Sequence, residues 1–162
     1  MKTWFHCLIV SCAGAFAWGA ETEPQVRSWP TAEAVEIAAK LFAEMRAKGT
    51  QSNGVMLGEW GTHTAAITVR LADGVAELHR EIADFFIVLE GEATLVTGGT
   101  LINASEKSVG ELRATAIKGG EKRVLRAGDM AYIPSGVPHQ LLVKGRFAYY
   151  VIKAKATVAA KP

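Results

Sequence analysis

Cysteine is scarce in this sequence, and its two residues, Cys7 and Cys12, both lie close to the N-terminus. The rest of the chain therefore has no disulfide, no cysteine nucleophile and no thiolate metal ligand. An excess of one charge is lacking too, because 18 Lys and Arg residues stand against 16 Asp and Glu residues, without a basic run. Nucleic acid is therefore not an expected partner.

The first 20 residues differ from the rest of the chain and have the pattern of a secretory signal peptide. Lys2 is followed by an apolar run over residues 4–10 and by small residues that lead to Ala17. We expect residues 1–20 to be removed and the protein to be secreted or periplasmic, with no membrane partner after cleavage. Two alternatives stay open: a retained membrane anchor, and lipidation at Cys12, because the residues before it loosely fit a lipidation box.

The chain length predicts a single domain. With 162 residues and 49% apolar composition, the chain can form one sizeable core but not two ordinary domains. Its expected segments are a signal peptide over 1–20, a leader and amphipathic helix over 21–54, a β-rich region over 55–152 and a frayed tail over 153–162. The helix itself is expected over 31–48, where apolar residues recur at helical spacing between Thr31 as N-cap and Gly49 as stop signal.

After Gly54 the sequence pattern changes to short runs rich in Val, Ile, Thr and aromatic residues, separated by turn residues. Such runs, with no helical pattern between them, are typical of a β-sandwich or barrel. Asp73-Gly74 is the sharpest hairpin signal. The polar, glycine-rich segment 98–121 is expected to be a long connection. The fold is thus expected to be mainly β.

Two histidines, His79 and His139, have neighbours suited to metal binding. His79 is followed by Glu81 and Asp84 just before an apolar strand, and His139 follows a turn that contains two prolines and a glycine. Residues 79 and 81 would point to the same face of a strand. Imidazole and carboxylate ligands together suit divalent transition metals such as Mn, Fe, Ni or Zn.

Two motifs of the chain resemble those of the cupin superfamily. The second motif is the stronger match: glycine, five residues, proline, one residue, glycine, two residues and histidine stand at the family spacing, in Gly128, Pro134, Gly136 and His139. Only the final asparagine is missing, because Val143 occupies its place.

The first motif matches in part. The family pattern is His-x-His, three or four residues, then Glu, with a glycine seven positions later; here Asp84 stands seven positions before Gly91. His79 then takes the place of the first histidine and Glu81 that of the second, with a gap of two residues before the acid. The resemblance, which covers residues 55–152, implies a cupin-like jelly-roll β-barrel with one divalent transition metal held by the set His79, Glu81, Asp84 and His139.

Other polar residues are candidates for the surroundings of the metal. If the hairpin described above ran in register, His63 would lie opposite Asp84 and could supply the missing histidine ligand; a surface histidine is the alternative. Arg70, Tyr132 and Gln140 flank or parallel the ligand strands, which makes them candidates for the pocket mouth.

The resemblance leaves three functions open. The first is a metal-dependent enzyme acting on a small organic acid, a phenolic or a sugar-derived molecule, as a dioxygenase, isomerase or decarboxylase. The second is a metal-free module that binds a small ligand. The third is a structural cupin without catalysis, whose edge strands form a homodimer. The fold does not choose between them, since the superfamily hosts many chemistries.

We predict that export removes the N-terminal segment, because the Lys2 start, the apolar run and the Ala15-x-Ala17 exit together form a cleavable signal. N-terminal sequencing of the exported protein should begin at Trp18 or Glu21. A mature protein that begins at Met1, or at a lipidated Cys12, would contradict the prediction.

Overall fold

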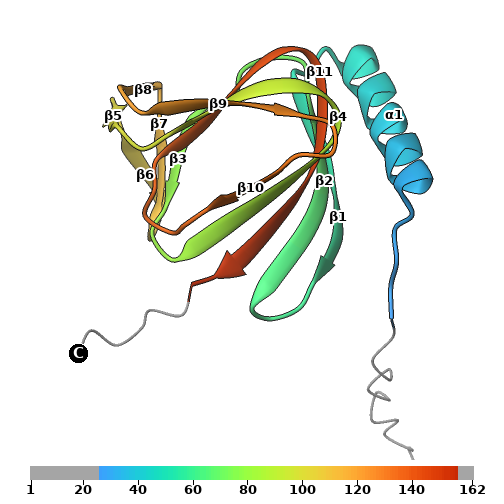
Figure 1. The fold of residues 1–162 in the computed structure, drawn as a ribbon, viewed down its shortest axis with the longest axis horizontal. Coiled ribbons are helices and arrows are strands. Elements are labelled where there is room, and N and C mark those ends of the chain that lie inside the picture. The colour runs from blue at the N-terminus through green and yellow to red at the C-terminus, as the bar shows by residue number, and fades with distance from the viewer. Residues whose placement is uncertain (1–25, 157–162) are drawn as a thin grey trace, which may run out of the picture.

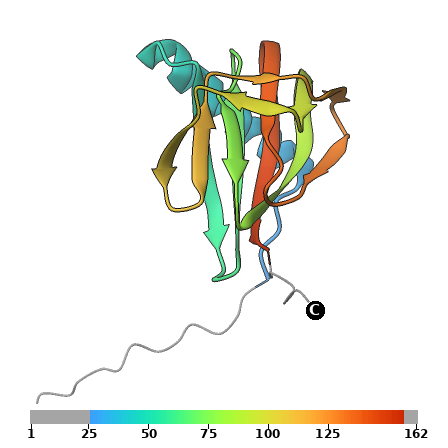
Figure 2. The same ribbon diagram turned by 90° about the vertical axis from the view of Figure 1, so that its left-hand side faces the viewer.

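The computed structural model describes residues 26–156, and its strands curve into a barrel with one helix along the outside (Figure 1, Figure 2). The mainly β fold expected from the sequence is confirmed. The expected signal peptide, both cysteines and the last residues of the tail lie outside the described residues. Within residues 26–156, no helix is long and apolar enough to cross a membrane.

The helix α1 (Thr31–Lys48) has the expected bounds. The cap position is Pro30 rather than Thr31, and no side chain caps the helix, because Thr31 already takes helical geometry. Gly49 ends the helix in the left-handed conformation, with a φ of 67°, and its N–H donates to the Met45 carbonyl oxygen. One face of α1 is buried against the outside of the barrel, and this contact joins Phe42 and Met45 to Ile67 of β2.

The strands form a nine-stranded sheet and a separate pair. Their bounds are β1 (Ser52–Glu59), β2 (His63–Arg70), β3 (Ala76–His79), β4 (Ile82–Thr97), β5 (Thr100–Ile102), β6 (Ser105–Ser108), β7 (Glu111–Ala114), β8 (Ala116–Lys118), β9 (Glu121–Arg126), β10 (Met130–Ile133) and β11 (His139–Lys155). The sheet runs in the order β1-β2-β11-β3-β7-β6, and β4 pairs with β9, β10 and β11. The two longest strands, β4 and β11, pair with each other and hold the barrel together.

Side chains of β4 and β11 point alternately to the two faces of the sheet, and each face carries its own apolar cluster. Phe86, Phe147 and Tyr149 belong to the cluster inside the barrel. Ala148, between the last two, belongs to the cluster that packs under α1. Successive side chains of a strand point to opposite faces, so one strand supplies both clusters.

Three expectations differ from the structure. Asp73-Gly74 does not join two paired strands: β2 and β3 are both neighbours of β11, and the Asp73 carboxylate accepts a hydrogen bond from the Val143 N–H. The segment 98–121 contains the four short strands β5 to β8 rather than one long connection. The chain from Lys153 to Lys155, expected in a frayed tail, is the end of β11.

Gly91 lies where β4 bends beside the irregular register of β11. Its φ is +84°, and a Cβ at this position would lie 2.0 Å from the Arg146 carbonyl oxygen. Only glycine fits both requirements.

We predict that Gly91→Ala lowers the free energy of unfolding by about 3 kcal/mol, since positive φ costs roughly 1–2 kcal/mol and overpacking adds a similar amount. Gly98→Ala is the matched control, because Gly98 has a φ of +74° but no atom within 4 Å of the added Cβ. Urea denaturation should place the Gly98→Ala loss near 1 kcal/mol. Equal losses in the two variants would contradict the account of the bend.

Candidate metal centre

Three buried polar side chains meet inside the barrel, and the sequence predicted all three as ligands. His79 ends β3, Asp84 lies near the start of β4, and His139 begins β11. Their exposed fractions are 2%, 1% and 4%. The Asp84 Oδ2 atom lies 3.4 Å from Nε2 of each histidine.

Glu77 completes the group. One ligand atom from each of Glu77, His79 and His139 lies within 4.8 Å of the other two. Glu77 stands two residues before His79 in β3, so both side chains point to the same face of the strand. We call Glu77, His79, Asp84 and His139 the barrel cluster.

Glu81 is not brought into the barrel cluster. It is exposed, and it lies in the bend between β3 and β4, where it lines a separate cavity with Val109 and Lys155. The physical reason is that β3 ends at His79, so the two-residue alternation that would have aligned residues 79 and 81 stops there.

The sequence did contain a signal for Glu77. Glu77, one residue, His79, four residues and Asp84 match the family spacing of the first motif, with Glu77 in the place of the first histidine. Aligning His79 with that first histidine shifted the motif by two positions.

Cross-strand pairing explains how the barrel cluster is assembled. Glu77 lies directly opposite His139 of β11 and Arg113 of β7. Asp84 lies directly opposite Lys153 of β11. Opposed residues of antiparallel strands have their side chains on the same face, so the sheet register alone brings these groups together.

The imidazole rings are oriented by oxygen acceptors outside the barrel cluster. Nδ1 of His79 faces the Glu111 carboxylate, its cross-strand partner, and Nδ1 of His139 lies 3.1 Å from the Val137 carbonyl oxygen. A carbonyl or carboxylate oxygen accepts hydrogen bonds, so each Nδ1–H donates to it and each Nε2 faces the cluster. This is the arrangement by which metal-binding histidines are held in proteins.

His139 Nε2 is the most informative atom of the site. It is buried, and within residues 26–156 it has no hydrogen-bond partner. It lies 3.4 Å from Asp84 Oδ2 and 3.9 Å from Glu77 Oε2. A buried polar atom without a partner is costly, and a cation between these groups would remove that cost. The donor set of two imidazoles and two carboxylates therefore fits a divalent transition metal.

Burial and neighbouring charges shift the pKa values of the residues in the barrel cluster. Burial raises the pKa of Asp84, but the two imidazoles and the Lys153 ammonium outweigh burial and hold that pKa far below its usual value. Burial likewise raises the pKa of Glu77, whereas His79 and Arg113 lower it, and the net direction is down. Burial lowers the pKa of His79, but the Asp84 and Glu77 carboxylates raise it to about 9. Both acids are therefore ionised at neutral pH.

Sequence reasoning missed Lys153, Glu111 and Arg113. Nζ of Lys153 lies 2.9 and 3.0 Å from the two Asp84 oxygens and 2.9 Å from His79 Nε2. Arg113 Nε lies 3.3 Å from Glu77 Oε1. Lys153 was placed in the tail, and the other two lie in the segment that was expected to be a connection.

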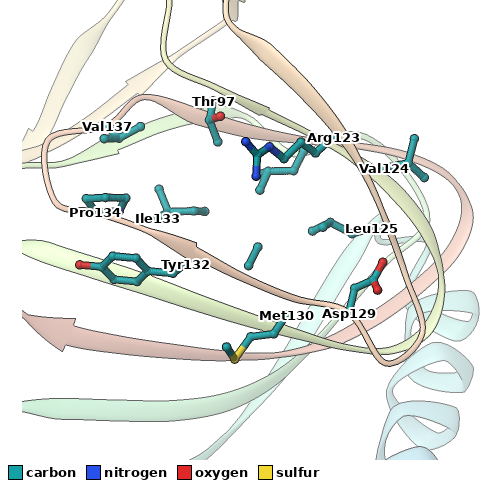
Figure 3. Close-up of a pocket in the computed structure, with 12 residues that line it drawn as sticks. Thr97, Arg123, Val124, Leu125, Asp129, Met130, Tyr132, Ile133, Pro134 and Val137 are labelled. Atoms are coloured by element: carbon teal, nitrogen blue, oxygen red, sulfur yellow. The ribbon is translucent and has the colours of Figure 1, made fainter.

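Two cavities adjoin the barrel interior. The smaller, of about 20 Å³, borders Glu77 and His139 and is lined by Arg70, Gln140 and Tyr149 as well. The larger, of about 540 Å³, has walls from β4, β9, β10 and the turn after β10 (Figure 3). None of the barrel cluster lines it.

The remaining sequence candidates divide between the two sides of the barrel. Arg70 and Gln140 line the small cavity beside the site. Tyr132 is 56% exposed and lines the larger cavity instead. His63 is exposed, stacks on Trp60 and pairs with Ala154 of β11, so it does not lie opposite Asp84.

The pKa of His79 predicts the pH dependence of stability in protein stripped of metal by a chelator. Because folding raises this pKa from 6.5 to about 9, the stabilising effect is complete below pH 6.5 and is lost as pH rises through 9. The loss should be about 3 kcal/mol. Urea denaturation at several pH values measures it. His79→Gln should flatten the profile over this range, whereas His63→Gln should keep it; an unchanged profile in His79→Gln would contradict the assignment.

No protein-family model and no curated protein sequence matches the chain. Solved structures do. Salicylate 1,2-dioxygenase from Pseudoaminobacter salicylatoxidans, as an adduct with gentisate, is 16% identical with a TM-score of 0.54, over 75% of this chain and 31% of that chain. Hydroquinone 1,2-dioxygenase from Sphingomonas sp. TTNP3 is 15% identical with a TM-score of 0.49, over 65% and 66%. A cupin superfamily protein from Desulfitobacterium hafniense DCB-2 is 16% identical with a TM-score of 0.47, over 66% and 79%. At these identities the likeness concerns the fold alone, and this chain has a mainly β barrel fold like that of salicylate 1,2-dioxygenase.

Proposed function

We propose that this protein is a metal-dependent cupin enzyme that binds one divalent transition metal (Mn, Fe, Ni or Zn) and acts on a small organic acid or phenolic molecule. The Nε2 atom of His139 carries the proposal, because it is buried among His79, Glu77 and Asp84 and has no hydrogen-bond partner within residues 26–156. The metal ligands are then His79, His139 and Glu77, with Asp84 as the fourth.

Two imidazoles and one or two carboxylates leave coordination positions open for a ligand. When bound, the metal would supply Lewis acidity to an oxygen atom of the substrate. The protein supplies the positioning. Glu111 and Val137 hold the two rings through their Nδ1 protons, and Arg113 holds Glu77. The apolar barrel around these groups limits access of water.

The small cavity, at about 20 Å³, admits one group of a substrate rather than a whole molecule, and its surroundings favour an acidic group. Arg70 lines it beside Glu77 and His139, and Arg70 Nε lies 3.3 Å from the Tyr149 hydroxyl oxygen. Within residues 26–156 no carboxylate forms an ion pair with Arg70. A guanidinium group without a carboxylate partner is suited to bind a carboxylate or phenolate next to the metal. The gentisate adduct of salicylate 1,2-dioxygenase gives a precedent for a small aromatic acid in a related fold.

One observation favours a second candidate, a metal-free module that binds a small ligand. The Lys153 ammonium already lies against Asp84 and His79, so a cation is present in the barrel without a metal. In this case Arg70 and the small cavity would serve binding alone. In either case we propose, from the N-terminal sequence, that the protein acts outside the cytoplasm.

Metal titration by calorimetry tests the ligand set, with Mn²⁺ and Zn²⁺ as probes and chelator-treated protein without a His-tag. His79→Ala, His139→Ala and Glu77→Gln should each weaken binding by at least about tenfold, because each removes one ligand atom.

Two matched controls accompany these variants. His63→Ala and Glu81→Gln change exposed residues of the same types and should bind metal as the wild type does. If Glu81→Gln loses the metal while Glu77→Gln keeps it, the shifted alignment of the first motif is correct after all. If wild-type protein takes up neither ion, the metal-free candidate replaces the enzyme.

A further inference from the structure

Lys153 places an ammonium group within the barrel cluster. Its Nζ atom contacts both Asp84 oxygens and His79 Nε2, at 2.9, 3.0 and 2.9 Å. These are atoms that a bound metal would use. The contact is built into the sheet, since Lys153 of β11 lies directly opposite Asp84 of β4.

The ammonium and a divalent ion cannot share these atoms. The Lys153 ammonium lies within hydrogen-bond distance of His79 Nε2 and of both Asp84 oxygens, so it competes for the lone pairs that an ion would need. A divalent ion at the same atoms would also stand within a few ångström of a positive charge, and this repulsion is strong in a buried site. Metal binding therefore requires the ammonium to leave.

The surface next to Lys153 offers a place for the displaced side chain. The side chain of Lys153 is 36% exposed, so it reaches solvent without opening the barrel. It also lines an outer cavity of about 150 Å³, together with Glu59, Thr62 and His63. Glu59 lines the same cavity, so its carboxylate would act as counter-ion for the ammonium in that position.

We propose that Lys153 is the resident cation of the barrel cluster, and that metal binding exchanges its ammonium for the ion. The metal-free protein keeps the buried Asp84 charge paired through Lys153. The metal-bound protein pairs the same charge through the ion, with Lys153 turned toward Glu59. The Lys153 ammonium and the ion thus exclude each other, and Lys153 sets the affinity that an ion needs in order to enter. The exchange rests on the proposed function, because it presupposes that a divalent ion binds the barrel cluster in competition with the Lys153 ammonium.

The decisive variant is Lys153→Met, which keeps the length of the side chain and removes its charge. Its metal-free form should melt at a lower temperature than wild type, because Asp84 loses its cation. Its affinity for Zn²⁺ or Mn²⁺ should rise by at least about tenfold, because no ammonium has to be displaced. Saturating metal should restore its melting temperature to the wild-type value or above.

Lys155→Met is the matched control. Lys155 lies two residues further along β11, lines the same outer cavity and is exposed. It contacts none of the barrel cluster through a hydrogen bond or ion pair within residues 26–156. Both the melting temperature and the metal affinity of Lys155→Met should equal those of wild type.

Lysine labelling of the wild-type protein provides a test that needs no variant. Reductive methylation, read by mass spectrometry, should modify Lys153 slowly in the metal-free protein and several-fold faster at saturating Zn²⁺. Lys155 should react at the same rate in both conditions. Equal labelling of Lys153 with and without bound metal would overturn the exchange even if Lys153→Met failed to fold.

The outcomes separate the exchange from the proposed function. Tighter binding by Lys153→Met than by wild type supports both. Binding by Lys153→Met alone supports the resident cation and refutes the metal-dependent wild-type enzyme. Binding by wild type that is equal to or tighter than that of Lys153→Met refutes the exchange and leaves the metal site intact. Binding by neither protein refutes both proposals.

Discussion

The carboxylate of Asp84 is buried inside an apolar barrel, and the rest of the site depends on how its charge is balanced. Its exposed fraction is 1%, so water contributes almost nothing to its solvation. An isolated carboxylate in such a place would be strongly destabilising. Positive charge comes instead from His79 and from Lys153, and the neighbouring Glu77 is balanced by Arg113. The proposed stability and metal affinity of the site both depend on which cation contacts Asp84.

The charged groups are brought together because the two long strands of the barrel, β4 and β11, pair with each other along most of their length. β4 and β11 pair from His139 opposite Thr97 to Lys155 opposite Ile82, so β11 contributes a histidine at one end and a lysine near the other. The short strands β3 and β7 add the remaining groups in register, with Glu77 opposite Arg113 and His79 opposite Glu111. The same strands carry the apolar side chains that exclude water. The same strands therefore carry both the apolar core and the site residues, and a change of register in either long strand would affect both.

Much of the fold and three of the four residues of the barrel cluster were readable in the sequence. Helical spacing predicted α1, and the glycine, proline and histidine spacing of the second motif predicted His139 as a ligand. His79 and Asp84 were found because they precede an apolar strand. Glu77 was missed because the two-residue alternation of side chains was extended to residue 81. The point at which β3 ends depends on its pairing with other strands, and local sequence does not reveal it. Lys153 was missed because an Ala/Lys-rich C-terminus resembles a frayed tail, whereas pairing with β2 and β4 makes it a strand. Glu111 and Arg113 belong to a short strand that local composition does not reveal.

The central claim is that the barrel cluster is a cation site in which the metal and Lys153 alternate. Crystals of the chelator-treated protein, measured before and after soaking in Zn²⁺ with anomalous diffraction at the zinc absorption edge, test it most directly. The account predicts an anomalous peak between Nε2 of His79, Nε2 of His139 and the Glu77 carboxylate, with Lys153 withdrawn from Asp84 only in the soaked crystals. A barrel without a peak at saturating Zn²⁺, or a peak at that position with Lys153 still bound to Asp84, would contradict it.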